Sequence, residues 1–207
     1  MSSSSLLPAP GAAQSASDGH ALAEGPERQA ARAALKAVDE ARAHGHPIVL
    51  CEALTDAARC LAALHAYTQS EDYLQQALHW AGMLHSADLR ADLLCALAEV
   101  ACNEADLLVQ RKDHTQEGVQ RRQAARERAR DWSHEAACLA GATSDPHWEV
   151  KVLLRASDVL DRGGDRDEAV LIQNRAMALM GLAETHASDA PDAAPGVVRV
   201  AAVTTLM

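Results

Sequence analysis

Residues 47–84 read PIVLCEALTDAARCLAALHAYTQSEDYLQQALHWAGML, and this stretch decides the fold. Its first half carries an apolar stripe with steps of four, three, four and three residues, the spacing of one helix face. The stripe consists of Leu50, Leu54, Ala57, Leu61 and Leu64. A second stripe consists of Leu74, Ala77 or Leu78, Ala81 and Leu84. Two helices joined so closely are expected to fold back antiparallel, and they need further helices to bury both apolar sides.

A polar break, residues 67–72 (YTQSED), separates the two stripes. Thr68 and Glu71 within it have the spacing of a capping box, in which each side chain bonds a backbone N–H of the other end of the turn. We therefore expect the second helix to begin at this box.

Apolar stripes of the same period continue on both sides of this hairpin, with Gly or Pro where each one stops. We expect an all-α protein of about seven helices, because no internal stretch alternates with a period of two. The other expected helices open at Pro26 and close at Gly45, run from about Asp88 to Arg111, from after Asp113 to Gly141, from Pro146 to a Gly163-Gly164 cap, and from about Asp165 to Leu182.

The domain organisation follows from where these stripes begin and end. The helical domain is expected to span residues 24–185. Residues 1–23 are Ser, Ala, Gly and Pro with little to form a core, so we expect a disordered leader. Residues 186–207 are expected to be a linker followed by an apolar tail that begins at Val197.

Composition narrows the class of function. The net charge of −10 disfavours a general polyanion binder, because phosphate binding needs a positive field. No run of eighteen apolar residues and no export signal is present, so we expect a cytoplasmic protein without a membrane partner. Five cysteines, an odd number, lie within the apolar stripes, which favours free buried thiols over disulfides. They are Cys51, Cys60, Cys95, Cys102 and Cys138.

Residues 162–170, RGGDRDEAV, followed by Ala176, resemble the turn and second helix of a tetratricopeptide repeat. Aligned in this way, Ala62, Ala81, Leu97-Ala98 and Ser157 take the positions where that family packs helices closely. The resemblance covers about residues 26–183 and implies antiparallel pairs stacked as a right-handed superhelix. It departs from the family in length, since Ala62, Ala98 and Ser157 lie 36 and 59 residues apart while the usual repeat has about 34 residues.

In the family that this chain resembles, the first helix of each pair lines a concave groove that holds a peptide or helix of a partner. The resemblance therefore implies a non-enzymatic scaffold or adaptor for another protein. An ordinary solvated helix face is the alternative for the implied groove residues. These residues are Asp56, Arg59, Asp92, Glu99, Asn103, Lys151, Asp158 and Arg162.

The segment 111–130 is positively charged, with seven Lys or Arg against three acids. Arg122, Arg126 and Arg130 step by four and are expected to form one ridge. Such a ridge suits an acidic protein surface. A nucleic acid is a weaker alternative, because no aromatic residue for base stacking lies among the arginines. A ligand-sensing or nucleic-acid-associated regulator is the alternative function, and an exposed extension that balances the acidic remainder is the alternative structural reading.

Ten histidines and five cysteines raise the question of a metal. His44, His46 and either Cys51 or His85 are the candidates, but His44 and His46 would diverge around a helix end. The sequence has no Cys-x-x-Cys or His-Glu-x-x-His pair, no Gly-rich phosphate loop and no nucleophile elbow. We therefore expect no metal, no cofactor and no catalytic residues, and a metal enzyme is the weakest of the three classes.

Overall fold

The computed structural model describes residues 25–143 and 145–181, and the predicted leader (1–23) and the linker and tail (186–207) lie outside this part. Within the described residues the chain forms seven α-helices and no strand, which confirms the all-α prediction. The helices are α1 (Pro26–His44), α2 (Pro47–Ala63), α3 (Tyr67–Met83), α4 (Ala87–Gln110), α5 (Gln116–Ala140), α6 (Pro146–Gly163) and α7 (Arg166–Leu179).

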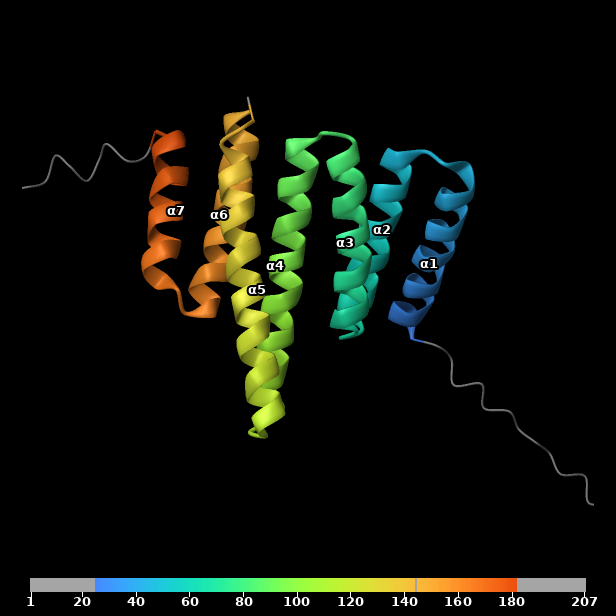
Figure 1. The fold of residues 1–207 in the computed structure, drawn as a ribbon, viewed down its shortest axis with the longest axis horizontal. Helices are drawn as coiled ribbons and strands as arrows, with labels where there is room; N and C mark the ends of the chain where they lie inside the picture. The colour runs from blue at the N-terminus through green and yellow to red at the C-terminus, as the bar shows by residue number, and fades with distance from the viewer. Residues whose placement is uncertain (1–24, 144, 182–207) are drawn as a thin grey trace, which may run out of the picture.

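The helices stand roughly side by side and reverse direction at each short turn (Figure 1). Each packs on its neighbour in sequence, so the predicted antiparallel pairs are present, and α4 also packs on α6. No comparable packing joins α2 to α4. The α4–α5 hairpin is the longest, with helices of 24 and 25 residues, and its turn projects beyond the other helices (Figure 1).

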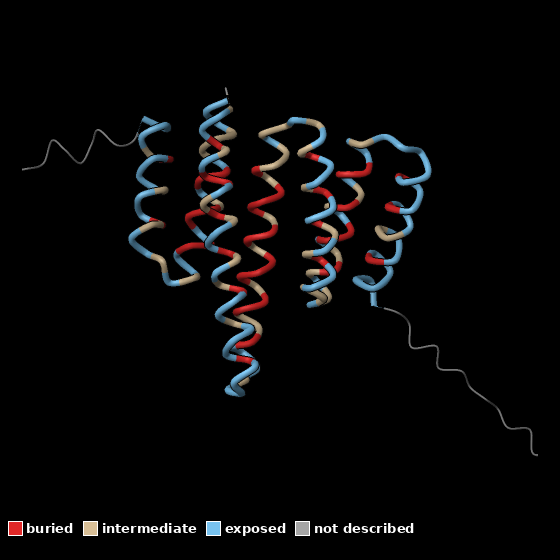
Figure 2. Tube along the Cα trace, viewed as in Figure 1, coloured by how far each residue is buried: buried red, intermediate tan, exposed pale blue. Residues whose placement is uncertain are grey.

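The core consists of Leu, Val, Ala and Cys side chains. Buried positions, red in Figure 2, recur along each helix. Small residues let α2 and α3 approach closely. The Ser70 hydroxyl donates to the Ala58 carbonyl at 2.8 Å, and the Cys51 thiol donates to the Ala77 carbonyl at 3.5 Å. Ala81 is fully buried, as predicted. Ala62 packs against the core as well, but it is only partly buried.

Glycine and proline mark the helix ends as predicted. Gly45 and Gly164 adopt left-handed conformations, with φ of 70° and 99°, directly after α1 and α6. Pro26, Pro47 and Pro146 occupy the first helical positions, where a missing N–H costs nothing.

The predicted capping box at the start of α3 is wrong. The helix begins at Tyr67, so Thr68 and Glu71 both lie inside it, and Ala66 precedes it without a side-chain cap. The turn itself lies at residues 64–66, where His65 has a positive φ of 59°. Glu71 is used instead in an ion pair with Arg128 of α5, at 3.3 Å.

All five cysteines are free, but their burial differs from the prediction. Cys51, Cys95 and Cys102 are buried, whereas Cys60 is partly exposed and Cys138 is exposed. Cys138 lies on the exposed side of α5, whose buried residues are mainly alanines. Burial raises the pKa of the Cys95 thiol to about 12.

Candidate functional site

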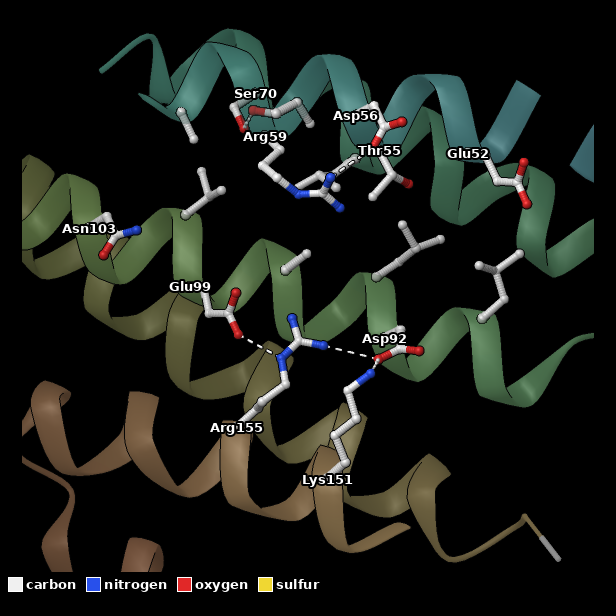
Figure 3. Close-up of a pocket in the computed structure, with 17 residues that line it drawn as sticks. Glu52, Thr55, Asp56, Arg59, Ser70, Asp92, Glu99, Asn103, Lys151 and Arg155 are labelled. Carbon is white, nitrogen blue, oxygen red and sulfur yellow. Dashed lines mark hydrogen bonds and ion pairs between the residues drawn. The ribbon is translucent and has the colours of Figure 1, made fainter. Parts of the chain in front are cut away.

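A groove of about 620 Å³ lies between α2 and α4, with α3 beneath it and α6 along one side (Figure 3). We call it the α2–α4 groove. Six of the eight predicted groove residues line it: Asp56, Arg59, Asp92, Glu99, Asn103 and Lys151. The other two, Asp158 and Arg162, line a shallower pocket along α4 and α6 that shares Glu99 and Asn103 with the groove. The structure thus gathers the eight residues along one continuous surface.

The groove is open because α2 and α4 make no direct polar contact within the described residues. No hydrogen bond or ion pair links these two helices among the described residues. Its floor is apolar, with buried Leu74, Leu93 and Val100. Ala62 on α2 and Ala96 on α4 have side chains too small to fill the space between the helices.

On the other side of α4, Arg155 of α6 closes the corresponding gap. Its Nε donates to Glu99 Oε1 at 2.7 Å and its NH1 donates to Asp92 Oδ1 at 3.0 Å (Figure 3). Trp148 Nε1 donates to the second oxygen of Asp92 at 3.3 Å. Both carboxylates are therefore held against α6, and the guanidinium bridges two acids that lie seven residues apart on α4.

The same arrangement repeats seven residues further on. Arg162 donates to Asn103 Oδ1 at 2.8 Å and to Asp106 Oδ2 at 2.6 Å. Asp92, Glu99 and Asp106 on α4 therefore face Arg155 and Arg162 on α6. We call these five residues the α4–α6 ion-pair row. It holds two helices together that are separated in sequence by the whole of α5.

The two rims of the groove differ in charge. On the α2 rim, Asp56 and Arg59 pair with each other at 2.7 Å, and both are exposed. Glu52 on this rim makes no hydrogen bond or ion pair with any described residue. On the α4 rim, the two acids are balanced by Arg155 and, more weakly, by Lys151. Burial disfavours the charge of Arg155, but the hydrogen bond that it donates to Glu99 and the nearby carboxylates outweigh burial and raise the pKa of Arg155.

Sequence reasoning missed Arg155 as a site residue. It lies four positions after Lys151 and seven before Arg162, both of which were predicted. That helical spacing places all three on one side of α6 and was the signal available. Lys151 is a weaker contributor, because its Nζ lies 4.0 Å from Asp92 Oδ1.

The predicted ridge of Arg122, Arg126 and Arg130 is divided in the structure. Arg130 pairs with Glu168 of α7 at 2.7 Å. Arg122 and Arg126 are partly buried and make no hydrogen bond or ion pair with described residues.

The adjoining face of α5 carries a second group of charges. Arg121 and Arg128 both contact Glu104, at 3.0 and 3.1 Å, and Glu104 is only 9% exposed. Arg128 also contacts Glu71. Burial raises the pKa of Glu71, and the charge of Arg128 opposes this shift without cancelling it. These arginines fasten α5 to α3 and α4.

No group of three or more His, Cys, Asp and Glu side chains in the described part is placed to hold a metal ion. The helices of this part include none long and apolar enough to cross a membrane.

No family model and no curated protein matches the chain. Solved structures similar to it include the de novo designed helical repeat protein DHR64, with a TM-score of 0.44 and 19% identity over 75% of this chain and 83% of that one. The DHF58 filament has a TM-score of 0.41 and 20% identity over 75% and 82%. BtubC (BKLC) from P. vanneervenii has a TM-score of 0.34 and 14% identity over 87% and 82%. The stacked antiparallel helices make this chain a helical repeat protein, and these likenesses concern its fold alone.

Proposed function

We propose that this protein is a tetratricopeptide-like, non-enzymatic scaffold that holds a peptide or helix of a partner protein in the α2–α4 groove. The observation that carries the proposal is the groove itself, which has a volume of about 620 Å³, an apolar floor and charged rims. The free cysteines support a reducing, cytoplasmic location.

The lining of the groove supports a helix or extended segment with an apolar face. Leu74, Leu93 and Val100 offer apolar contacts for anchors spaced along one side of such a segment. Glu52 and the small Ala62 lie on the α2 wall. Because Glu52 has no cation among the described residues, a Lys or Arg beside the apolar anchors fits this rim best.

The charges on the other rim support binding rather than proton transfer. Asp92 and Glu99 are both engaged by Arg155, so these carboxylates are already satisfied and hold the wall of the groove in place. A rigid wall lowers the ordering cost of binding.

The proposal is tested with a random peptide library displayed on phage. Peptides selected on the wild-type protein are measured against Ala62→Trp, which fills the groove, and against Ala33→Trp, which places the same side chain on the exposed face of α1. We expect affinity to fall at least about tenfold on Ala62→Trp and to be unchanged on Ala33→Trp. Peptides that bind all three proteins equally would place the binding surface elsewhere.

A second candidate function is a regulator that senses an anionic ligand or associates with nucleic acid through α5. The observation favouring it is that Arg122 and Arg126 have no ion-pair partner among the described residues, in a segment of net positive charge. Binding of labelled single-stranded DNA tests it, because phosphate binding weakens steeply with salt whereas an apolar groove does not. Binding that is lost in Arg122→Glu/Arg126→Glu and falls steeply with salt supports this candidate.

A further inference from the structure

The outer face of α7 carries exposed apolar side chains beside Asp167 and Asn174, and no described element covers it. Val170 is 52% exposed and Leu171 is 69% exposed. Met177 and Ala178 lie seven residues further along the same side. This spacing is that of a helix face that packs against another element. Ala169 and Ala176, which pack on the rest of the protein, lie on the opposite side.

The outer face of α1, at the other end of the helix stack, is polar. On α1, the side opposite the buried Val38 carries Gln29, Lys36 and Glu40, all exposed. Stacked helical repeats require such a polar outer face on a terminal helix, because no further repeat covers it. The α1 end therefore satisfies this requirement, whereas the α7 end meets it only in part, because Asp167 and Asn174 share the face with Val170 and Leu171.

We propose that residues 197–207 of this same chain pack along the outer face of α7 and act as its cap. The chain continues from the C-terminal end of α7, the helix whose outer face is exposed. Gly181, two residues after the last residue of α7, has a left-handed φ of 69°. The same conformation at Gly45 and Gly164 precedes the reversals into α2 and α7.

The connecting length suffices for this packing. Residues 182–196 lie between α7 and the proposed cap. Fifteen residues in extended form span about 50 Å, and the 14-residue helix α7 is about 21 Å long. Residues 197–207 can therefore reach every part of the α7 face without strain.

The chemistry of the segment matches the face. Residues 197–207 read VVRVAAVTTLM, with eight apolar residues and a single charge, Arg199. On α7, the exposed Asp167 in the first turn makes no ion pair among the described residues. Arg199 and Asp167 are thus complementary, while the valines of the segment cover Val170 and Leu171.

Trypsin cleavage after Arg199 in the full-length chain tests the proposal. Release of residues 200–207 is followed by intact mass in the wild type, in Leu171→Glu and in Leu154→Glu. Leu154 is the matched control, since it is an exposed leucine of α6 that lines the pocket shared with α4. We expect cleavage roughly tenfold faster in Leu171→Glu, because cleavage follows the undocked population, and an unchanged rate in Leu154→Glu.

Three results would overturn the proposal. Equal rates in all three proteins would show that the segment does not dock on α7. Faster cleavage in Leu154→Glu alone would place the segment beside α4 and α6. Protection that grows with protein concentration would mean that a second copy covers α7. Both substitutions are at exposed positions, so circular dichroism should show unchanged helix content.

Discussion

Replacing Arg155 by alanine removes the side chain that joins Asp92 and Glu99 of α4 to α6. The substitution leaves Asp92 and Glu99 facing α6 with their side chains only 33% and 38% exposed. The nearest remaining cation is Lys151, 4.0 Å from Asp92. Two partly desolvated carboxylates would then lie on the same helix face without a bridging charge.

The loss of unfolding free energy in Arg155→Ala can be estimated from the exposure of the paired side chains. Exposed ion pairs are worth about 0.2–1 kcal/mol, and breaking a fully buried pair costs about 3–5 kcal/mol. Arg155 is 28% exposed and so falls between these limits, at about 2 kcal/mol of unfolding free energy. With a urea dependence of about 2 kcal/mol/M, this lowers the unfolding midpoint by roughly 1 M.

The measurement is urea unfolding followed by circular dichroism, with Arg59→Ala as the matched control. Arg59 also pairs with a carboxylate, Asp56 at 2.7 Å, but the two side chains are 73% and 61% exposed. Its loss should cost less than about 0.5 kcal/mol. Arg155→Lys should recover only part of the loss, because one ammonium group cannot bridge both acids.

Equal decreases of the urea midpoint in Arg155→Ala and Arg59→Ala would contradict the stabilising role of the Arg155 ion pairs. A double-mutant cycle with Glu99→Gln then locates the error. Coupling near zero between Arg155 and Glu99 would show that the ion pair does not stabilise the α4–α6 contact. Substantial coupling between Arg155 and Glu99, together with a small loss of unfolding free energy in Arg155→Ala, would show that α6 is held mainly by its apolar side chains.

Three further predictions concern packing, reactivity and pH. Ala81→Leu should lower the free energy of unfolding by about 1–3 kcal/mol through overpacking, while the partly buried Ala62→Leu should cost less; equal thermal shifts would contradict the assigned helix contacts. A thiol reagent at mildly alkaline pH should label Cys138 first and Cys95 last, as mapped by peptide mass spectrometry, because the Cys95 pKa is raised to about 12. Hydrogen bonds from an arginine and a histidine of α5 lower the pKa of Glu168. The stability that Glu168 contributes is therefore present above the ordinary Glu pKa and lost as pH falls through the lowered pKa, so Glu168→Gln should destabilise at neutral pH and have little effect in strong acid.

The periodicity of the sequence was sufficient to predict the helices and most of their ends. A stripe such as that from Leu50 to Leu64 needs no knowledge of the partner helix, because it reports which side of its own helix is apolar. The same holds for Gly45 and Gly164, whose left-handed conformations are local. The eight groove residues were also placed on one surface, since they occupy solvent-facing positions of alternate helices.

The errors arose where the outcome depends on contacts between distant segments. Thr68 and Glu71 have the local spacing of a cap, but Glu71 is drawn into the pair with Arg128 of α5. Arg155 contacts acids 56 and 63 positions earlier in the chain. Neither partner can be identified until α4, α5 and α6 have been aligned in space. Cys138 was misplaced for the same reason, because the width of the buried face of α5 depends on its neighbours.

The seven-residue spacing of the α4–α6 ion-pair row affects how α6 finds its native position along α4. Contacts advance in the same direction on both helices, from Asp92 with Arg155 to Asp106 with Arg162, so the two helices run parallel. Sliding α6 along α4 by seven residues, about 10.5 Å, would bring Arg155 opposite Glu99 and Asp106. Arg155 would again face two acids, while Asp92 would lose Arg155 and Arg162 would pass the last acid of α4.

The charges therefore select which faces of α4 and α6 meet, while Arg155 alone does not distinguish two axial positions one step of seven residues apart. The short connection at residues 141–145 removes this ambiguity, because it ties the start of α6 to the end of α5, and α5 is packed along α4. A flexible insertion in that connection is expected to leave the helices intact while allowing a second, misaligned docking of α6 and α7 on the rest of the stack.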